Sequence, residues 1–289
     1  MSRHYSVVIP AYNEEKGIGH VIERILSVGK QTGVAFEIIV VDDYSTDATR
    51  DIAGRYPVRV VRNVQNFGYG YSVKQGILAA SEADIVITDA DGTYPVEALP
   101  ELMREYERGF DMVVGARQGK HYRGSFLKYP ARLLFLWLSE FAAGRRIPDI
   151  NSGLRIFKKP LALRYFHTFS SGFSFTTTIT LAFMLNAHSI GYVPIAYDAR
   201  IGKSKVRYFR DTLRSGQIIV ESILFYNPIK IYLLCAFLIG LGALAAAVLS
   251  LFLPVKIIGT LLFGYTFAIL AFCIGLVTVY LRFMSKARE

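Results

Sequence analysis

Two aspartates separated by one residue close a short apolar run in the stretch ITDADGTYP, residues 87–95. A divalent cation such as Mg²⁺ or Mn²⁺ takes hard oxygen ligands, keeps part of its water shell and bridges phosphate oxygens. Asp89 and Asp91 can therefore share one cation with a diphosphate. Gly92 and Pro95 break the chain directly afterwards, which leaves the two carboxylates at the end of the run.

Two more polar clusters follow apolar runs in the same way. PAYNEE begins at Pro10, and DDYSTD begins at Asp42. A single carboxylate at such a place can equally cap the next helix, and Glu14 and Asp47 are placed to do so. Three clusters at one sheet edge favour a binding site over three separate caps.

The elements that would position these clusters alternate along the first part of the chain. Runs rich in Val and Ile predict strands at residues 5–10, 37–41, 58–61, 84–88 and 111–114. Helical periodicity lies between them and is clearest over residues 14–30. This alternation predicts an α/β fold with a mostly parallel, doubly wound sheet, in which ligands bind beyond the carboxyl ends of the strands.

Familiar nucleotide and metal motifs do not account for the clusters. The sequence has no G-x-G-x-x-G after the first predicted strand and no G-x-x-x-x-G-K-[ST]. The cysteines, Cys235 and Cys273, and the 5 histidines lack metal-ligand spacing. A cation at the aspartate pair is the expected means of neutralising phosphate charge.

The C-terminal part of the chain is far more apolar. Residues 231–255 and 257–281 are each 25 residues long and free of charge, and about 20 residues suffice to cross a bilayer. We expect two membrane spans joined by a tight turn at Pro254 and Lys256, because a buried soluble hairpin would usually keep a polar stripe. Basic residues flank both spans, so the positive-inside rule places both termini and residues 1–228 in the cytosol. The protein would be integral to the cytoplasmic membrane, or to the endoplasmic reticulum of a eukaryote.

Charge changes sign along the chain. Residues 1–116 carry 11 basic and 17 acidic side chains, whereas residues 117–228 carry 17 basic and 5 acidic ones. A basic stretch ahead of membrane spans suits anionic lipid headgroups or a phosphorylated substrate, and its position disfavours nucleic acid as a partner. Residues 125–143 and 206–226 are expected to lie as helices on the bilayer surface, with an ordinary core helix as the alternative for the first.

The order of the motifs resembles the inverting family 2 glycosyltransferases of the GT-A fold, and within them the polyprenyl-phosphate glycosyltransferases related to dolichyl-phosphate mannose synthase. The motifs are PAYNEE, VVDDYSTDAT, RNVQNFGYGYSVKQG, DADGTYP, NSGLRIF and RIGKSK, over about residues 5–210. The resemblance implies transfer of a sugar from a UDP- or GDP-linked donor to undecaprenyl or dolichyl phosphate. The expected layout is a cytosolic GT-A domain over residues 1–228 and a two-helix membrane hairpin over residues 229–289.

The resemblance also implies roles for single residues. The residues implied to bind the donor are Pro10, Tyr12, Glu14, Asp42, Asp89, Ala90, Asp91, Arg200, Lys203 and Lys205. Asp89 and Asp91 would hold Mg²⁺ or Mn²⁺, and Arg117 would complete the catalytic set. The residues implied to bind the acceptor phosphate are Arg117, Arg132 and Ser152. The alternative for the two arginines is a plain surface position near lipid.

Two departures limit what the resemblance implies about the sugar. Thr93 stands where some relatives have a glutamine metal ligand, and residues 172–181 lack an acidic side chain that relatives often carry. We therefore do not carry over the mannose specificity.

A phosphomonoester acceptor is already largely anionic at neutral pH, since its second pKa is about 6, so it can attack without a strong general base. The enzyme must then neutralise and position two anions.

Two other functions stay open at this level. A processive polysaccharide synthase would carry a Q-x-x-R-W signature and more spans, whereas the only tryptophan here is Trp137. A catalytically inactive nucleotide-sugar-binding membrane module would bind donor without turnover. The sequence also leaves open the sugar, the nucleotide, the prenyl chain and the oligomeric state, a homo-oligomer included.

Overall fold

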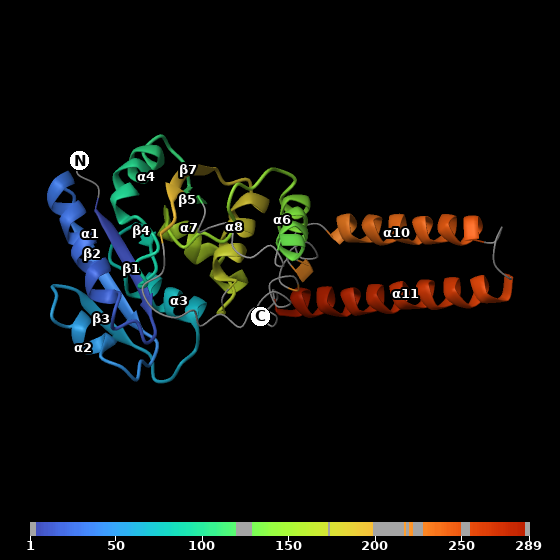
Figure 1. Ribbon diagram of the computed structural model, residues 1–289, viewed down its shortest axis with the longest axis horizontal. Helices are drawn as coiled ribbons and strands as arrows, with labels where there is room; N and C mark the ends of the chain where they lie inside the picture. The colour runs from blue at the N-terminus through green and yellow to red at the C-terminus, as the bar shows by residue number, and fades with distance from the viewer. Residues whose placement is uncertain are drawn as a thin grey trace. The chain divides into compact units, whose positions relative to one another are not determined.

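The computed structural model describes residues 4–119, 129–172, 174–198, 217, 220–221, 228–249 and 255–286. Contacts within the chain divide it into two compact units, Met1–Gly216 and Gln217–Glu289. The first unit contains a sheet with helices on both faces, and the second contains two long helices (Figure 1).

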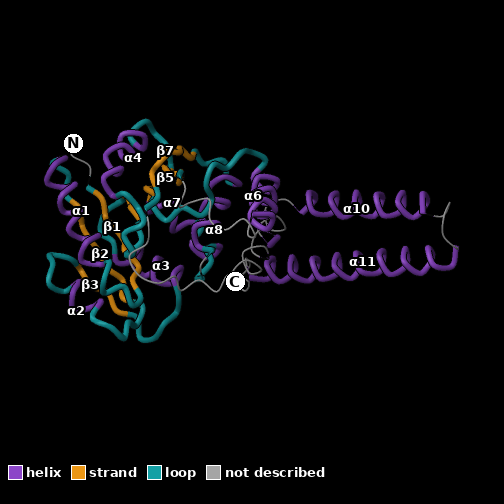
Figure 2. The backbone as a smooth tube through the Cα atoms, in the orientation of Figure 1, coloured by secondary structure: helices purple, strands orange, loops and turns teal. Residues whose placement is uncertain are grey.

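One mixed sheet organises the first unit (Figure 2). Its order among the described residues is β3-β2-β1-β4-β6-β5-β7. The strands are β1 (Tyr5–Ala11), β2 (Phe36–Asp42), β3 (Arg59–Arg62), β4 (Asp84–Ile87), β5 (Met112–Gln118), β6 (Arg155–Lys158) and β7 (Ile190–Ala196). Only β6 runs antiparallel to its neighbours, β4 and β5, within this described sheet. The predicted mostly parallel α/β sheet is confirmed.

Helices cover both faces of the sheet because successive strand residues point to opposite sides. Val7 and Ile9 of β1 belong to one core cluster, whereas Val8 belongs to the other. The first face is covered by α1 (Ile18–Thr32), α2 (Thr49–Ala53), the 3₁₀ turn η1 (Val96–Ala98) and α4 (Leu99–Tyr106). The second is covered by α3 (Tyr69–Ala79), α7 (Lys159–Arg164), η3 (Phe166–Thr168) and α8 (Phe175–Leu185).

Helix α1 begins later than its sequence pattern predicted, at Ile18 instead of Glu14. The residues before it are committed to other contacts: Asn13 adopts a left-handed conformation with φ 50°, and the backbone N–H of Glu14 donates to Oγ1 of Thr49 at 2.8 Å. The helix ends where Gly33 adopts φ 71°, a conformation that glycine accepts without strain. The polar segment that follows β1 therefore stays non-helical.

Helix α6 (Tyr129–Ala143) covers most of the first predicted surface helix, and residues 125–128 lie outside the described part. It packs against α8 and buries Ser139 and Ala142. Its opposite side exposes 48% of Trp137, whose ring stacks on Phe141 with centroids 5.6 Å apart. An apolar exposed side agrees with a surface helix, but its contact with lipid stays a prediction.

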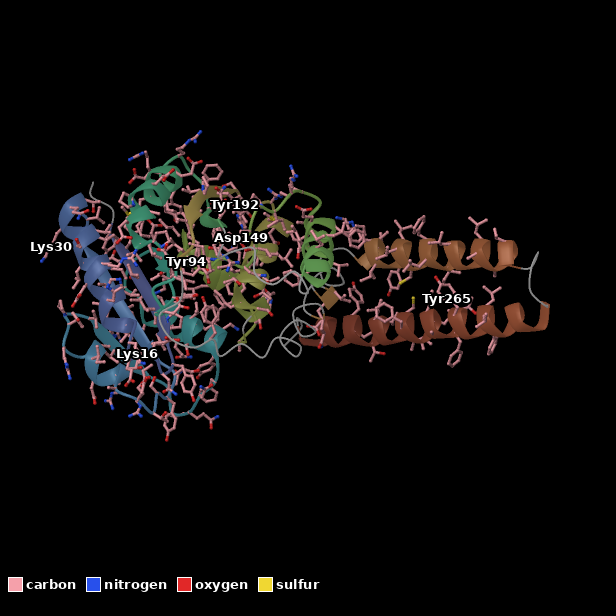
Figure 3. All side chains as sticks on the ribbon, in the orientation of Figure 1. Lys16, Lys30, Tyr94, Asp149, Tyr192 and Tyr265 are labelled. Carbon is pink, nitrogen blue, oxygen red and sulfur yellow. The ribbon has the colours of Figure 1, made fainter. Side chains whose placement is uncertain are left out.

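The second unit contains α10 (Pro228–Leu249) and α11 (Val255–Lys286), which pack along each other. Segments of 20 and 18 residues, Ile229–Val248 and Leu261–Thr278, have mean hydropathies of 2.5 and 2.2 and are long enough to cross a membrane. The ring of Tyr265 (Figure 3) lies against Gly242, and its hydroxyl donates to the carbonyl of Leu238. The predicted turn falls partly outside the described residues, while Lys256 already belongs to α11.

Candidate active site

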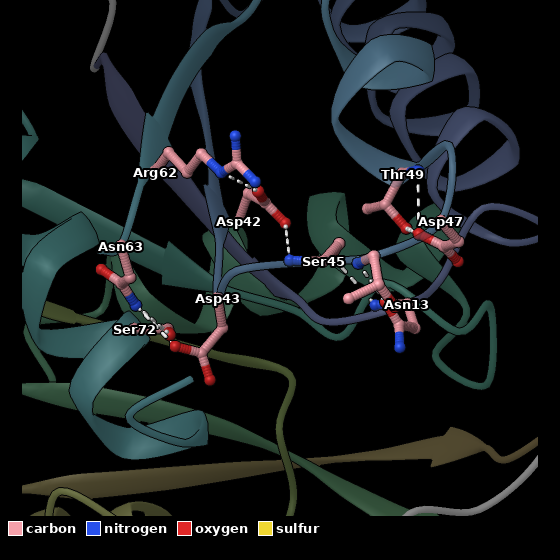
Figure 4. Close-up of polar contacts among 10 residues, drawn as sticks. Asn13, Asp42, Asp43, Ser45, Asp47, Thr49, Arg62, Asn63 and Ser72 are labelled. Carbon is pink, nitrogen blue, oxygen red and sulfur yellow. Dashed lines mark hydrogen bonds and ion pairs between the residues drawn. The ribbon is translucent and has the colours of Figure 1, made fainter. Parts of the chain in front are cut away.

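The polar segments after β1 and β2 are bonded to each other at the carboxyl edge of the sheet (Figure 4). The backbone N–H of Asn13 donates to Oγ of Ser45 at 3.0 Å, and Oδ1 of Asn13 accepts from the backbone N–H of Thr46 at 2.8 Å. Asp47 accepts from the backbone N–H of Thr49, the first residue of α2, at 3.0 Å. Asp47 is thus occupied by local structure, since it also accepts from the backbone N–H of Glu15 at 3.2 Å, but the N-cap residue of α2 is Ala48.

Asp42 ends β2 with a fully buried side chain. Its Oδ1 accepts from the backbone N–H of Ser45 at 3.0 Å, and its Oδ2 lies 3.4 Å from Nε of Arg62 without a hydrogen bond from any described residue. The Arg62 guanidinium lies over the ring of Tyr44, 5.3 Å from the centroid. The Asp42 carboxylate is therefore paired with Arg62, whose guanidinium also contacts the half-exposed ring of Tyr44.

The aspartate pair follows β4, the strand next to β1. Asp91 is only 6% exposed, and its Oδ1 accepts from both the backbone N–H and the hydroxyl of Thr93, at 3.0 and 2.7 Å. The hydroxyl of Thr93 is thus directed at a carboxylate and orients it. Gly92 makes the turn between them with φ 74°.

Asp89 receives a hydrogen bond from α3. The hydroxyl of Tyr69, the first residue of that helix, donates to Oδ1 of Asp89 at 3.1 Å. Burial, and then the Asp89 charge, raise the pKa of Tyr69 well above its ordinary value, which keeps the phenol protonated and able to donate. Nothing in the sequence marks Tyr69 for this contact, because a tyrosine after a glycine gives no signal of a carboxylate partner.

The oxygens of Asp89 and Asp91 suit a Mg²⁺ or Mn²⁺ ion that takes one or two protein carboxylates plus substrate phosphates. Both carboxylates already have hydrogen-bond partners that fix their orientation, as metal ligands usually do. Nowhere in the described part of the chain do three His, Cys, Asp or Glu side chains gather as a self-sufficient metal site. The residues therefore fit a cation that a bound diphosphate helps to hold.

Arg117 lies in β5 and is paired with Asp149, a partner that the sequence did not indicate. Its Nε and Nη2 donate to the two carboxylate oxygens at 2.7 and 3.0 Å, and its guanidinium lies 5.2 Å from the ring centroid of Tyr197. Burial alone would lower the pKa of Arg117, but Tyr94 and Asp149 raise it well above its ordinary value. The guanidinium is thus permanently charged and already engaged with a carboxylate.

The segment that follows Asp149 reaches the aspartate pair. A Cβ placed on Gly153 would lie 2.9 Å from Oδ1 of Asp89, so the glycine backbone packs directly against that carboxylate. The backbone N–H of Gly153 donates to the hydroxyl oxygen of Tyr94 at 2.6 Å. Asp149 and Tyr94 (Figure 3) therefore hold this segment from two sides.

Ser152 is fully buried, and none of the described residues bonds its hydroxyl. Its carbonyl accepts from Nε of Arg155 at 3.1 Å, and Nη1 of Arg155 donates to the carbonyl of Thr176 at the same distance. Arg155 is itself fully buried, and burial lowers its pKa. The buried arginine thus ties the Ser152 segment to the start of α8.

The other predicted site residues divide into two groups. Pro10 belongs to β1, and Tyr12, Glu14 and Ala90 lie at the same carboxyl edge as the aspartate pair, where a Cβ on Gly17 would meet the Ala90 carbonyl at 2.4 Å. The predicted residues outside the described part are Arg200, Lys203, Lys205 and the side chain of Arg132. The segment that leads to Arg200 passes the site, since the backbone N–H of Asp198 donates to the carbonyl of Thr93 at 3.0 Å.

Comparison with known proteins identifies the family. Residues 6–176, more than half of the chain, match glycosyl transferase family 2. The chain belongs to that family. It is 32% identical over 217 residues to a dolichyl-phosphate hexose transferase of Haloferax volcanii, an alignment that covers 75% of this chain and 92% of the relative. It is 25% identical over 256 residues to an undecaprenyl-phosphate 4-deoxy-4-formamido-L-arabinose transferase of Salmonella paratyphi B, covering 86% of this chain and 76% of that protein.

A solved structure gives the same fold. The glucosyl-3-phosphoglycerate synthase of Mycobacterium tuberculosis, in complex with Mn²⁺, uridine diphosphate and phosphoglyceric acid, aligns with a TM-score of 0.58 and 24% identity. The alignment covers 77% of this chain and 78% of that one. The mixed seven-stranded sheet is therefore of the GT-A type, as the resemblance implied.

Proposed function

We propose that this family 2 glycosyltransferase moves a sugar from a UDP- or GDP-linked donor to a polyprenyl phosphate at a membrane surface. One observation carries the proposal: Asp89 and Asp91, each bonded by a hydroxyl, follow β4 at the sheet edge where the polar segments after β1 and β2 are bonded to each other. That arrangement suits a nucleotide diphosphate at the carboxyl edge of a parallel sheet. The relatives named for dolichyl- and undecaprenyl-phosphate transfer support the lipid acceptor.

On the donor side, Pro10, Tyr12, Glu14 and Asp42 would contact the base and ribose, and Ala90 would lie at the diphosphate. Asp89 and Asp91 would hold Mg²⁺ or Mn²⁺, which when bound neutralises charge on the leaving nucleotide diphosphate. The Mn²⁺ in the structure of the Mycobacterium tuberculosis enzyme supports this choice of ion. Arg200, Lys203 and Lys205 would add positive charge near the phosphates.

On the acceptor side, the basic half of the chain would bring the lipid phosphate to the donor sugar. Residues 117–228 carry 17 basic and 5 acidic side chains, and the exposed side of α6 includes Trp137, a residue common at membrane interfaces. Arg132, on the same helix, and Ser152 would bind the acceptor phosphate. Arg117 would act on phosphate while paired with Asp149.

Orientation in the membrane follows from the two apolar helices and their basic flanks. We expect α10 and α11 to anchor the protein, with both termini and the sheet unit in the cytosol. A cysteine at Lys256 should then react with an impermeant thiol reagent added outside intact spheroplasts. Reaction of a cysteine near the N-terminus from outside would contradict this orientation.

The proposal is tested by incubating purified protein with a short polyprenyl phosphate, Mn²⁺ or Mg²⁺ and a panel of UDP- and GDP-sugars. Mass spectrometry of the lipid fraction should detect a polyprenyl-phosphate sugar with at least one donor. Elongation into a polymer would favour a polysaccharide synthase instead. Donor binding without any turnover across the panel would favour an inactive binding module.

A further inference from the structure

Asp43 of the DDYSTD motif is a carboxylate that could bind a metal or a substrate. In the structure it instead accepts hydrogen bonds from the backbone just before α3. Its side chain is 3% exposed, and its Oδ1 accepts from Nδ2 of Asn63 at 2.7 Å and from the backbone N–H of Phe67 at 3.0 Å. Its Oδ2 accepts from the backbone N–H of Gly68 at 2.8 Å. Figure 4 shows Asn63 directed at Asp43 and at Ser72 of α3.

The first turn of α3 is also fixed from its other side. The backbone N–H of Tyr71 donates to the carbonyl of Ser171 at 2.8 Å. A Cβ on Gly70 would lie 2.4 Å from the carbonyl oxygen of Ser170, so only glycine permits this approach. Gly68, which precedes the helix, has φ 98°, again a conformation suited to glycine. The backbone of Tyr69 is therefore held between two glycines that are both constrained.

Tyr69 carries this fixed geometry to the aspartate pair. Its hydroxyl donates to Oδ1 of Asp89 at 3.1 Å, while the Gly153 backbone lies against both carboxylate oxygens, with a virtual Cβ 2.9 and 3.0 Å away. The Asp89 carboxylate thus accepts a hydrogen bond from Tyr69 and packs against the backbone of Gly153. Both contacts come from outside β4, one from α3 and the other from the Gly153 segment, and both act on the position of this carboxylate.

We propose that Tyr69 is a positioning residue that orients Asp89 for the divalent cation. Asp43 and Asn63 fix the start of α3 and thereby the direction in which the Tyr69 hydroxyl points. The inference rests on the proposed metal role of Asp89. Partners that orient a metal ligand typically change metal affinity 10- to 100-fold when they are lost. Tyr69 would act through Asp89 and need not touch substrate.

The test compares Tyr69→Phe with Tyr71→Phe in the full-length protein. Tyr71 lies two residues on in the same helix, packs its ring 4.3 Å from that of Phe67, and has no hydroxyl hydrogen bond among the described residues. Free Mn²⁺ is followed by electron paramagnetic resonance as protein is added, with and without saturating UDP or GDP. We expect about 10- to 100-fold weaker Mn²⁺ binding for Tyr69→Phe and wild-type binding for Tyr71→Phe.

Two further measurements make the result decisive. Binding of UDP or GDP in EDTA should be equal in both variants, because the hydroxyl acts on the metal ligand. Asn63→Ala removes a hydrogen bond to Asp43 without touching the aspartate pair, and it should also weaken Mn²⁺ binding. This variant replaces Tyr69→Phe as the test if Tyr69→Phe does not fold. Wild-type Mn²⁺ affinity in folded Tyr69→Phe would overturn the inference alone. Absence of Mn²⁺ binding by the wild-type protein would overturn the metal role of Asp89 together with it.

Discussion

Removing the carboxylate of Asp149 should destabilise the sheet unit more than any single change at its exposed surface. Asp149 is 2% exposed and accepts from the backbone N–H, Nε and Nη2 of Arg117 and from the backbone N–H of Asn151. Asp149→Ala would leave a charged guanidinium and two backbone N–H groups without their acceptor. Breaking one side of a buried ion pair costs about 3 to 5 kcal/mol, and we expect a loss in that range.

Arg117→Ala should lower the free energy of unfolding by less, about 2 to 3 kcal/mol. The Asp149 carboxylate then loses the guanidinium but keeps the two backbone N–H donors of residues 117 and 151. The double variant should lose less than the sum of the single losses, with a coupling of about 2 kcal/mol. The fluorescence of Trp137, the only tryptophan and a residue of α6, follows urea unfolding of the sheet unit in detergent.

Additive losses in this double-mutant cycle would refute the reasoning, since they would mean that Arg117 and Asp149 do not depend on each other. The same variants separate stability from chemistry. If Arg117 also contacts phosphate, Arg117→Ala will lose more transfer activity than Asp149→Ala, although it loses less stability. If the pair mainly holds the Gly153 segment, Asp149→Ala and Arg117→Ala will lose activity together with stability.

Three other changes test separate parts of the account. Gly153→Ala should keep the melting temperature but lower kcat about 10- to 100-fold, because its new Cβ would displace the Asp89 carboxylate 2.9 Å away; unchanged kcat would show that this carboxylate position does not matter. Arg132→Ala should raise the KM for polyprenyl phosphate about 10- to 100-fold with donor binding unchanged, the cost of one charge-assisted contact, and an equal loss for both substrates would contradict an acceptor role. Asp111→Asn should lower the stability of the folded protein at neutral pH. Burial raises the pKa of Asp111, but Lys158, whose Nζ lies 2.6 Å from the carboxylate, and Ser189 lower it more. The pKa of Asp111 in the folded protein therefore lies below its unfolded value of 3.8. That stabilisation is complete above the unfolded value and is lost as pH falls through the folded one, so unfolding curves of wild type and Asp111→Asn should converge below pH 3.8, and a constant difference would be the contrary result.

The sequence predicted the sheet edge well because strand ends are marked locally. β1, β2 and β4 are short Val- and Ile-rich runs that stop at polar residues, and parallel strands bring those ends together. The sequence alone did not show which of Asp42 and Asp43 faces the candidate donor site. Neighbouring residues at a strand end face opposite sides of the sheet, so their roles differ. Asp42 lies beside Arg62 near the candidate donor site, whereas Asp43 builds the start of α3.

Contacts across long sequence separations were beyond the same reasoning. Arg117 and Asp149 pair across 32 residues of sequence. Asp149 precedes β6, a strand of four residues with charged ends that lies antiparallel between β4 and β5 and has no alternating pattern to mark it. β7 also escaped prediction because it contains Pro194, a residue tolerated there since β7 is the edge strand. Thr93 stands where some relatives have a glutamine metal ligand, and only the 2.7 Å hydrogen bond from its hydroxyl to Asp91 shows how this side chain is used.

The central claim is that the aspartate pair supports metal-dependent transfer of a sugar to a polyprenyl phosphate. Asp91→Asn tests it most directly, because asparagine keeps an oxygen that can accept from Thr93 while removing the charge that a cation requires. The measurement is the rate at which radiolabelled sugar enters the lipid fraction, for wild type with Mn²⁺, wild type in EDTA, and Asp91→Asn with Mn²⁺. The account predicts labelled lipid only in the first reaction, with circular dichroism showing both proteins folded. Labelled lipid at the wild-type rate in EDTA, or from Asp91→Asn, would contradict it.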